Sequence, residues 1–518
     1  MKVNPVTAKR RRRDKLVPSP FRNTSDECSS RGLSTVDGTK AKHMHPTCSS
    51  RAWRRAILAA LTGALGAPIV HAQSADALLD KLVEKGVLTT DEASELREQS
   101  DKDFTKAYQV KSGMPDWVTT FRIGGDFRGR YEGFFSSNDD FNTVNRFRYR
   151  LRLAFTAVLL DNFEVGVRLG SGNLDGGIPT GGIDPISQNQ TLQNNASKKG
   201  IFVDLAYMKW SPINTPVWSG AFTFGKMENP FIFSDMVFDN DYTPEGFAQT
   251  FAYRANDQHT LNLMAGQFIL DEIGVNSGTI ATGLQEADED PYLFGGQLLL
   301  SSTWTPKITT TVGGGYLTIM NKNSLLSSSV PNIGYGNERY TAVVANAPIL
   351  LAPVSDFETA VANASITYTF EKAPMYAGVF PVMLFGEYMH NFGAASDQDS
   401  GYTAGLLFGK ASKRGTWEVG YRWMRSQGDA WWEELPDSDF GAFYANALPN
   451  PPPPQARSQL AGYFPGPNVQ GSIVRVAYAP YDFLVLSAKV YFTTLIEPYF
   501  PDTDSHMTRV QVDAAVKF

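Results

Sequence analysis

The residues best placed to act on other molecules are four arginines at alternate positions in the stretch NRFRYRLRLAF, residues 145–155. Aromatic and aliphatic residues fill the positions between them, so an extended chain would have one strongly basic face and one apolar face. The four are Arg146, Arg148, Arg150 and Arg152. A column of fixed positive charge attracts anions and shapes the local field, which suits either a nucleic-acid patch or an ion path.

Neighbouring stretches continue the basic pattern. FRIGGDFRGRYEGFF and NFEVGVRLG alternate in the same way and add Arg122, Arg128, Arg130 and Arg168. If these stretches are adjacent strands, all eight arginines form one basic wall. The alternative interpretation is a set of scattered polar side chains with no common role.

An acidic and unusually apolar segment, ENPFIFSDMVFDNDYTPEGF, complements the basic wall. Its acidic residues are Glu228, Asp235, Asp239, Asp241 and Glu245. The aromatic residues among them would be poorly accommodated in open solvent, so we expect this loop to fold inward and narrow a path. Opposed acidic and basic walls would create a transverse field that filters ions. The alternative is an outer loop that packs on its neighbours.

The charge of the chain differs sharply between its two ends. Residues 1–72 hold 14 of the 47 basic and 4 of the 53 acidic residues, a net charge of +10, and residues 73–518 hold the other 33 and 49, a net charge of −16. A chain this acidic is a poor ligand for nucleic acid, so we exclude nucleic acid as a partner.

The basic N-terminal part contains a short apolar run, AILAALTGALGAPIV, which follows two arginines and precedes HA. This arrangement is typical of a secretory signal peptide. We therefore expect residues 1–43 to be an upstream extension outside the mature protein and residues 44–72 to be the signal peptide. Both cysteines, Cys28 and Cys48, precede the expected cleavage site, so the mature chain would contain no disulfide.

From Val118 onward, apolar and polar residues alternate in segments of about ten, which is typical of transmembrane β-strands. The expected strands are 118–134, 145–160, 162–172, 200–211, 219–227, 246–255, 259–270, 292–305, 308–320, 358–370, 380–391, 401–411, 414–425, 471–479, 483–493 and 506–518. We predict an all-β fold, a transmembrane antiparallel β-barrel of about sixteen strands over residues 118–518, with eighteen as the alternative. Residues 73–117 would form a short periplasmic helical segment.

In such a barrel the arginines must point inward. Each arginine on the lipid face costs about 2–4 kcal/mol at the midplane, so four would cost on the order of 8–16 kcal/mol, which is comparable with the stability of a whole domain. A soluble β-sandwich also alternates, but sixteen strands behind a signal peptide favour the barrel. Within the strand 200–211, Asp204 and Lys209 differ in parity, so if Asp204 faces the lumen, Lys209 should lie near the interface or at a bulge.

The chain ends in an alternating strand whose last residue, Phe518, resembles the signal read by the outer-membrane assembly machinery. An even number of strands would place both termini on the periplasmic side. The expected location is therefore the outer membrane, with lipid or lipopolysaccharide and the assembly machinery as partners.

Several segments resemble those of the bacterial putative porin family. They are LLDKLVEKGVLTTDEASELR, TLQNNASKKGIFVDLAYMKW, GKMENPFIFSDMVFDNDYTPEG and DEDPYLFGGQ, and the likeness covers about residues 76–518. The resemblance implies an outer-membrane diffusion channel of the sixteen-stranded type without a defined solute and, by analogy with general porins, a homotrimer. The loop 426–470, with its proline run ALPNPPPPQ, matches no motif of this family.

We therefore expect an outer-membrane porin, a passive channel for small hydrophilic solutes or ions, with the basic wall opposite the acidic loop. A channel specific for anions, such as oxyanions or carboxylates, and a loop-mediated adhesin or receptor are the alternatives. We expect no enzyme, because His259, His390 and His506 stand isolated in the sequence. We also expect no cofactor and no metal site.

Overall fold

The computed structural model describes residues 114–172, 186–193, 195–196, 198–273, 289–325, 336–344, 347–444, 462–498 and 504–518. The expected upstream extension, the signal peptide and residues 73–113 of the expected helical segment lie outside these residues. The proline run of the long loop lies outside them as well.

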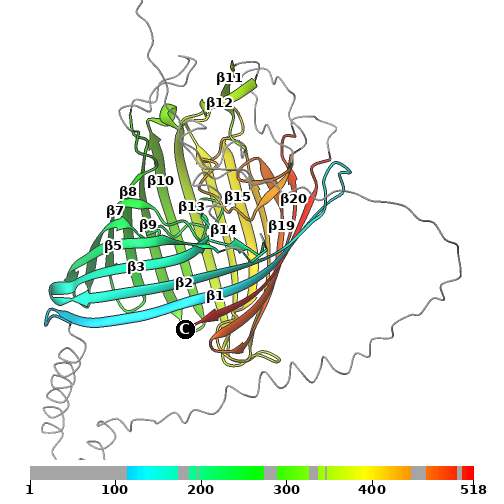
Figure 1. Cartoon of the computed structure of the whole chain (residues 1–518). Coiled ribbons are helices and arrows are strands. Elements are labelled where there is room, and N and C mark those ends of the chain that lie inside the picture. The colour runs from blue at the N-terminus through cyan, green and yellow to red at the C-terminus, as the bar shows by residue number, and fades with distance from the viewer. Residues whose placement is uncertain are drawn as a thin grey trace, which may run out of the picture. The chain divides into compact units, whose positions relative to one another are not determined.

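Sixteen long antiparallel strands form one closed barrel, drawn in Figure 1. In order around the barrel they are β1 (Val118–Ser136), β2 (Val144–Leu159), β3 (Phe163–Gly172), β5 (Gly200–Asn214), β6 (Trp218–Lys226), β7 (Glu245–Arg254), β8 (His259–Ile269), β9 (Tyr292–Thr305), β10 (Ile308–Met320), β13 (Phe357–Phe370), β14 (Phe380–Asn391), β15 (Ser400–Gly409), β16 (Thr416–Ser426), β19 (Val469–Tyr481), β20 (Leu484–Leu495) and β21 (Met507–Lys517). β1 pairs with both β2 and β21, which closes the ring. The predicted fold class and strand number are confirmed.

The remaining elements are short. β4 (Gln190–Thr191) pairs with β2 beyond the end of β3. Two small hairpins are formed by β11 (Arg339–Val344) with β12 (Ala347–Pro353) and by β17 (Gly441–Tyr444) with β18 (Gly462–Pro465). Two 3-10 turns, η1 (Leu160–Asn162) and η2 (Lys322–Ser324), complete the described elements. None of the described helices is long and apolar enough to cross a bilayer.

Alternation of side chains explains why these segments form a barrel wall. Ile123 and Phe147 are 66 % and 60 % exposed on the outer face, whereas Glu132 on the inner face is 0 % exposed. Across β1 and β2, the rings of Phe127 and Tyr149 stack on the outside with centroids 6.3 Å apart. Each strand therefore presents apolar residues outward and polar residues inward, as a membrane barrel requires.

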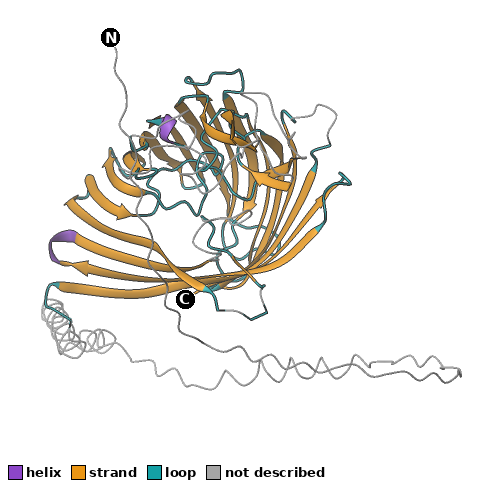
Figure 2. Cartoon of the chain, turned by 45° about the horizontal axis from the view of Figure 1, so that its top comes forward, coloured by secondary structure: helices purple, strands orange, loops and turns teal. Residues whose placement is uncertain are grey.

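The connections differ in length at the two ends of the barrel. At one end the links are short, such as η1 and residues 306–307 and 482–483. At the other end the links are long, including 227–244, 321–356 and 427–468. Figure 2 shows loops from this long-loop end passing inside the ring of strands.

Two of the long connections fill part of the barrel interior. We name residues 227–244, between β6 and β7, the inner loop, and residues 427–444, after β16, the second loop. Met236 and Val237 of the inner loop and Trp431 of the second loop are 0 % exposed, and all three belong to the same hydrophobic cluster. The two loops together are called the plug below.

Candidate functional site

The inner loop crosses the barrel interior from one wall to another. Its Ile232 N–H donates to Oε1 of Gln297 on β9 at 2.7 Å, and its Ser234 N–H donates to Oε2 of Glu387 on β14 at 2.9 Å. Near the other end of the loop, Oδ1 of Asp241 lies 2.8 Å from Nη1 of Arg150 on β2. Because β2 is far from β9 and β14 around the ring, the loop lies within the lumen.

The second loop is joined to the inner loop by main-chain hydrogen bonds. The amide of Asp437 donates to the carbonyl of Asp235 at 2.8 Å, and the amide of Asp239 donates to the carbonyl of Leu435 at 2.7 Å. Nε1 of Trp431 donates to the carbonyl of Val237 at 2.9 Å. The apolar side chains of both loops share one core, so the loops pack as a single body.

Charge on the inner face of the barrel is concentrated in half of the wall. On the strands β6 to β10 and β13 to β15, the charged residues at inward positions are Glu387 and Arg254, the last residue of β7. The other eight strands, β16, β19, β20, β21, β1, β2, β3 and β5, are adjacent around the ring and carry all the predicted arginines. We call these eight strands the charged wall and the other eight the neutral wall.

The buried carboxylate of Glu132 gathers four arginines of the charged wall. Its oxygens lie 2.5 Å from Nε of Arg146, 2.8 Å from Nη2 of Arg509, and 3.4 Å from Nη1 of both Arg130 and Arg148. Charge-assisted contacts of this kind are roughly twice as strong as neutral hydrogen bonds. Glu132 therefore organises the wall at the level where the second loop approaches it.

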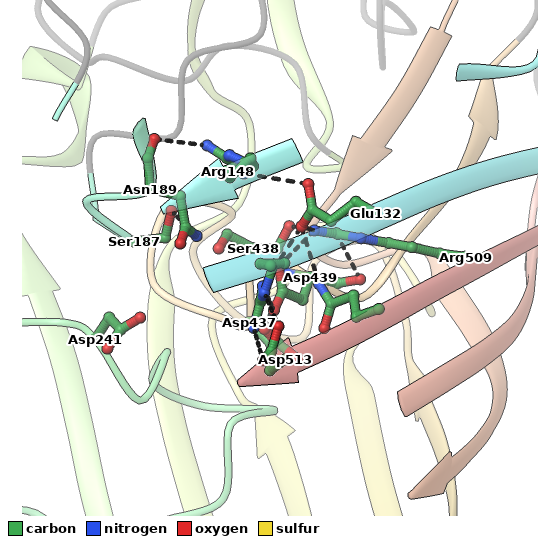
Figure 3. Close-up of polar contacts among 12 residues, drawn as sticks. Glu132, Arg148, Ser187, Asn189, Asp241, Asp437, Ser438, Asp439, Arg509 and Asp513 are labelled. Carbon is green, nitrogen blue, oxygen red and sulfur yellow. Dashed lines mark hydrogen bonds and ion pairs between the residues drawn. The ribbon is translucent and has the colours of Figure 1, made fainter. Parts of the chain in front are cut away.

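The second loop is anchored at this cluster through Asp439, as Figure 3 shows. Asp439 lies 2.5 Å from Nη2 of Arg509 and 3.1 Å from Nη1 of Arg130. The Arg130 guanidinium also binds both oxygens of Asp513, each at 2.8 Å. The arginine side chains are thus held by carboxylates of the wall and of the loop.

Aromatic rings surround the guanidinium of Arg509. Its Cζ lies 4.9 Å from the ring centroid of Phe134, 5.2 Å from that of Tyr463 and 5.9 Å from that of Tyr491. Cation–π contacts contribute about 0.5–2 kcal/mol each, most when the cation is desolvated. These rings fix the position of the arginine that holds the second loop.

A second group of ion pairs attaches the inner loop to β2 and β3. Asp241 contacts Arg150 and Arg152, each at 2.8 Å, and Asp126 lies 3.1 Å from Arg150. On β3, Arg168 forms ion pairs with Glu228 of the inner loop and with Asp204 of β5. The acidic loop and the basic wall, which the sequence predicts to face each other, are in direct contact at these ion pairs.

Burial and neighbouring charges set the pKa of the loop carboxyls. Burial raises the pKa of Asp241, but Arg150 and Arg152 outweigh burial and hold this pKa below its usual value. Burial likewise raises the pKa of Asp235, and its partner Arg422 on β16 outweighs the effect, so the net shift is downward. Both carboxylates are therefore held in the charged form that the arginines require.

Three of the predicted site residues stand apart from these groups. Arg122 is exposed near the short-turn end and has no ion pair within the part of the chain that the structure describes. Glu245 lies in register with Lys226 and bonds it at 2.9 Å, on the same side of the sheet as the outward-facing Phe247. Asp239 is buried between the two loops and accepts a hydrogen bond from the amide of Ser438 at 2.9 Å.

Arg128 and Phe518 have different surroundings. Nη2 of Arg128 donates to Oδ1 of Asn189 at 2.7 Å. Phe518 continues the last strand along β1, where its amide and carbonyl both bond Gly125, at 3.1 and 2.8 Å. Phe518 therefore lies at the seam between the first and last strands, and the residue is 62 % exposed.

Several residues of the site were not predicted as members. They are Asp126, Glu132, Asp204, Arg422, Asp439, Arg509 and Asp513. Most of them occupy inward-facing alternate positions on their own strands, so the alternation in the sequence could have identified them. Asp439 carries no such signal because it lies in an irregular loop.

The histidines were expected to be isolated, yet His390 has polar neighbours. Its Nδ1 lies 3.0 Å from Oγ of Ser400 and 3.5 Å from Oδ1 of Asp399. Both neighbours approach the same ring nitrogen, so the imidazole does not bridge them as a catalytic triad demands. Among the described residues, no group of three or more His, Cys, Asp or Glu is arranged to hold a metal ion.

Residues 138–348 match the model of a family described as putative porin, which confirms the resemblance seen in the sequence over that range. No curated protein sequence matches the chain. Among solved structures, the high-pH structure of Pseudomonas putida OprB is similar, with 12 % identity, coverage of 81 % of this chain and 97 % of that chain, and a TM-score of 0.47. Salmonella typhi OmpF in complex with daunomycin is also similar, with 9 % identity, coverage of 78 % and 98 %, and a TM-score of 0.41.

Proposed function

We propose that this chain is an outer-membrane porin that lets small hydrophilic solutes and ions diffuse passively through its barrel. The match of residues 138–348 to the putative porin family supports a channel of this kind. The closed ring of sixteen strands with an apolar outer face supports integral membership of a membrane.

The observation that carries the proposal is the charged wall behind the plug. Charged side chains inside a barrel are stable when they are paired or in contact with water, and they are costly in contact with lipid. Here every inward arginine from Arg130 to Arg168 on the first three strands has a carboxylate partner. The solute path would therefore run where the polar side of the plug meets the charged wall, because the apolar core of the plug covers much of the neutral wall.

The plug would set the selectivity of this path. Asp241, paired with Arg150 and Arg152, and Glu228, paired with Arg168, place carboxylates of the inner loop among arginines of the wall. Closely spaced charges of both signs create a steep local field, which orients polar solutes and discriminates between ions. Asp439 of the second loop adds a further negative charge to the same region.

The remaining features of the proposal concern location and assembly. Residues 44–72 would direct export, the long loops would face the exterior, and both termini would lie in the periplasm. Phe518 would mark the final strand for the assembly machinery, and three copies would associate in a lipopolysaccharide-containing membrane. Its exposed position at the end of the seam strand supports a role in recognition.

Planar-bilayer recording tests the proposal. The purified, folded chain should form channels with a linear current at low voltage, and a salt gradient should give a reversal potential that reports ion selectivity. Fluorescent sugar or amino-acid efflux from vesicles containing the protein would show solute passage. A folded barrel that gives neither current nor efflux would contradict the proposal.

A further inference from the structure

Arg128 is set apart from the arginines around it by the nature of its partner. On β1 it lies directly opposite Arg150 of β2 on one side and Ala515 of β21 on the other. Its bonded neighbour is the uncharged amide of Asn189, at 2.7 Å. Its Nε is buried and has no hydrogen-bond partner among the described residues.

The carboxylates near Arg128 are committed to other arginines. Asp513 binds Arg130 through both oxygens, each at 2.8 Å. Asp241 binds Arg150 at 2.8 Å, and Asp126 binds it at 3.1 Å. Arg128 therefore lies beside two other cations, Arg130 and Arg150, and the nearby carboxylates make their ion pairs with those arginines.

Two other side chains beside Arg128 are small or uncharged. Ala515 offers only a methyl group, whereas the neighbouring positions of the same parity on β21 hold the longer side chains of Asp513 and Lys517. On the loop side, Nδ2 of Asn189 donates to Oγ of Ser187 at 2.9 Å, which turns the amide oxygen toward Arg128. Figure 3 shows Asn189 and Ser187 at the edge of the same charged cluster. A neutral amide oxygen is a weaker acceptor for a guanidinium than a charged oxygen.

We propose that Arg128 is the centre of an oxyanion-binding subsite, at which a solute group with two or more terminal oxygens pauses on its way through the barrel. This proposal rests on the proposed channel function and names a solute class for it. A planar guanidinium can bind two oxygens of one anion in parallel. The anion would also give Arg128 the charged partner that it lacks among the described residues.

The experiment measures block of the potassium chloride current by sulfate in planar bilayers containing the full chain. The wild type should show a saturable reduction of current, and acetate should compete as a carboxylate probe. Arg128→Gln should raise the half-blocking sulfate concentration at least tenfold. Arg128→Lys, which keeps the charge but loses the fork, should give an intermediate value.

The matched control is Arg425→Gln. Arg425 lies three residues after the inward Arg422 on β16, so alternation points its side chain to the outer face of the barrel. The half-blocking concentration of this variant should equal that of the wild type. Equal block in Arg128→Gln and the wild type would overturn the subsite, and full block in Arg128→Lys would overturn binding through the fork. A conducting wild type without saturable block refutes the subsite alone, whereas a wild type without conductance refutes the channel.

Discussion

Asp439 and Arg509 are separated by 70 residues in the sequence, with β17, β18, β19 and β20 between them, yet they form one ion pair, 2.5 Å between Oδ1 and Nη2. Arg509 belongs to the last strand of the barrel and also binds Glu132 of the first strand at 2.8 Å. The second loop is therefore attached at the place where the barrel closes. Detaching the loop would leave Arg509 and Arg130 short of one counter-charge.

Asp439→Asn should loosen the second loop without unfolding the barrel. Removing one partner of a buried pair costs about 3–5 kcal/mol, and here the cost falls on the contact between the loop and the wall. The single-channel current should become larger and noisier, and residues 427–444 should become sensitive to proteolysis. The β-sheet signal in circular dichroism should stay unchanged.

Asp504→Asn is the matched control, because Asp504 is an exposed loop aspartate that binds Ser137 and His506 at the rim. Its current and protease sensitivity should match the wild type. If the two variants behave alike, the ion pair of Asp439 does not hold the loop.

Arg150→Ala should raise the relative permeability of cations. The change removes a positive charge and leaves Asp126 without a partner and Asp241 with Arg152 alone. A unit charge about 7 Å from the path contributes about 0.6 kcal/mol in water, which is a factor of roughly three in local ion concentration. Reversal potentials in a potassium chloride gradient measure the ratio of cation to anion permeability.

Arg148→Ala provides the comparison within the same strand. Glu132, the carboxylate that Arg148 contacts, keeps Arg130, Arg146 and Arg509. The permeability ratio should therefore change less than in Arg150→Ala. A larger change in Arg148→Ala would place the narrow part of the path at Glu132 and away from Asp241.

The attachment of the two loops should weaken as pH rises from 5 to 8. Burial raises the pKa of Asp437 from its ordinary 3.8 to about 7, and the nearby carboxylates of Asp235 and Asp439 add to the rise. Lys489 opposes it with a smaller effect. Between these two values the docked loop keeps a proton that the detached loop releases, so its stability is full at low pH and is lost as pH rises through 7. The pKa values of Asp235 and Asp439 are lowered, so these groups add no pH dependence in this range.

Hydrogen exchange of residues 427–444 at pH 5, 6, 7 and 8, corrected for intrinsic rates, measures this effect. Protection should fall from pH 5 to 7 in the wild type and level off toward pH 8. Asp437→Asn keeps the shape and removes the titration, so its protection should be flat. A wild type that becomes less protected as pH falls would show that another group controls the junction.

The wall of the barrel could be predicted closely from the sequence. Strands 292–305, 308–320 and 380–391 were predicted with the bounds that the structure has. Alternation with a period of two is imposed by the strand itself, and lipid on one side makes the alternation strong. The basic wall followed from the same rule.

The pairing of charges could not be predicted, because it depends on closure of the ring and on irregular loops. Arg509 reaches Glu132 only because the last strand pairs with the first. Asp204 forms the bulge where β5 slips against β3, between Leu205 and Val203, which puts Asp204 beside Arg168 and leaves Lys209 opposite Glu164. The sequence predicted either an interface position for Lys209 or a bulge in this strand. The position of the bulge could not be predicted without knowing the register of β5 against β3.

A single thiol at position 122 or 123 tests which face of β1 meets water. The native cysteines, Cys28 and Cys48, lie before the expected cleavage site, so a chain starting at residue 73 has no competing thiol. Arg122 and Ile123 are both exposed, but alternation points them to opposite faces of the barrel. Arg122→Cys in reconstituted vesicles should react with a charged, membrane-impermeant maleimide, and Ile123→Cys should react only after the vesicles are dissolved in detergent. Equal labelling at both positions in intact vesicles would mean that lipid does not cover the outer face of β1.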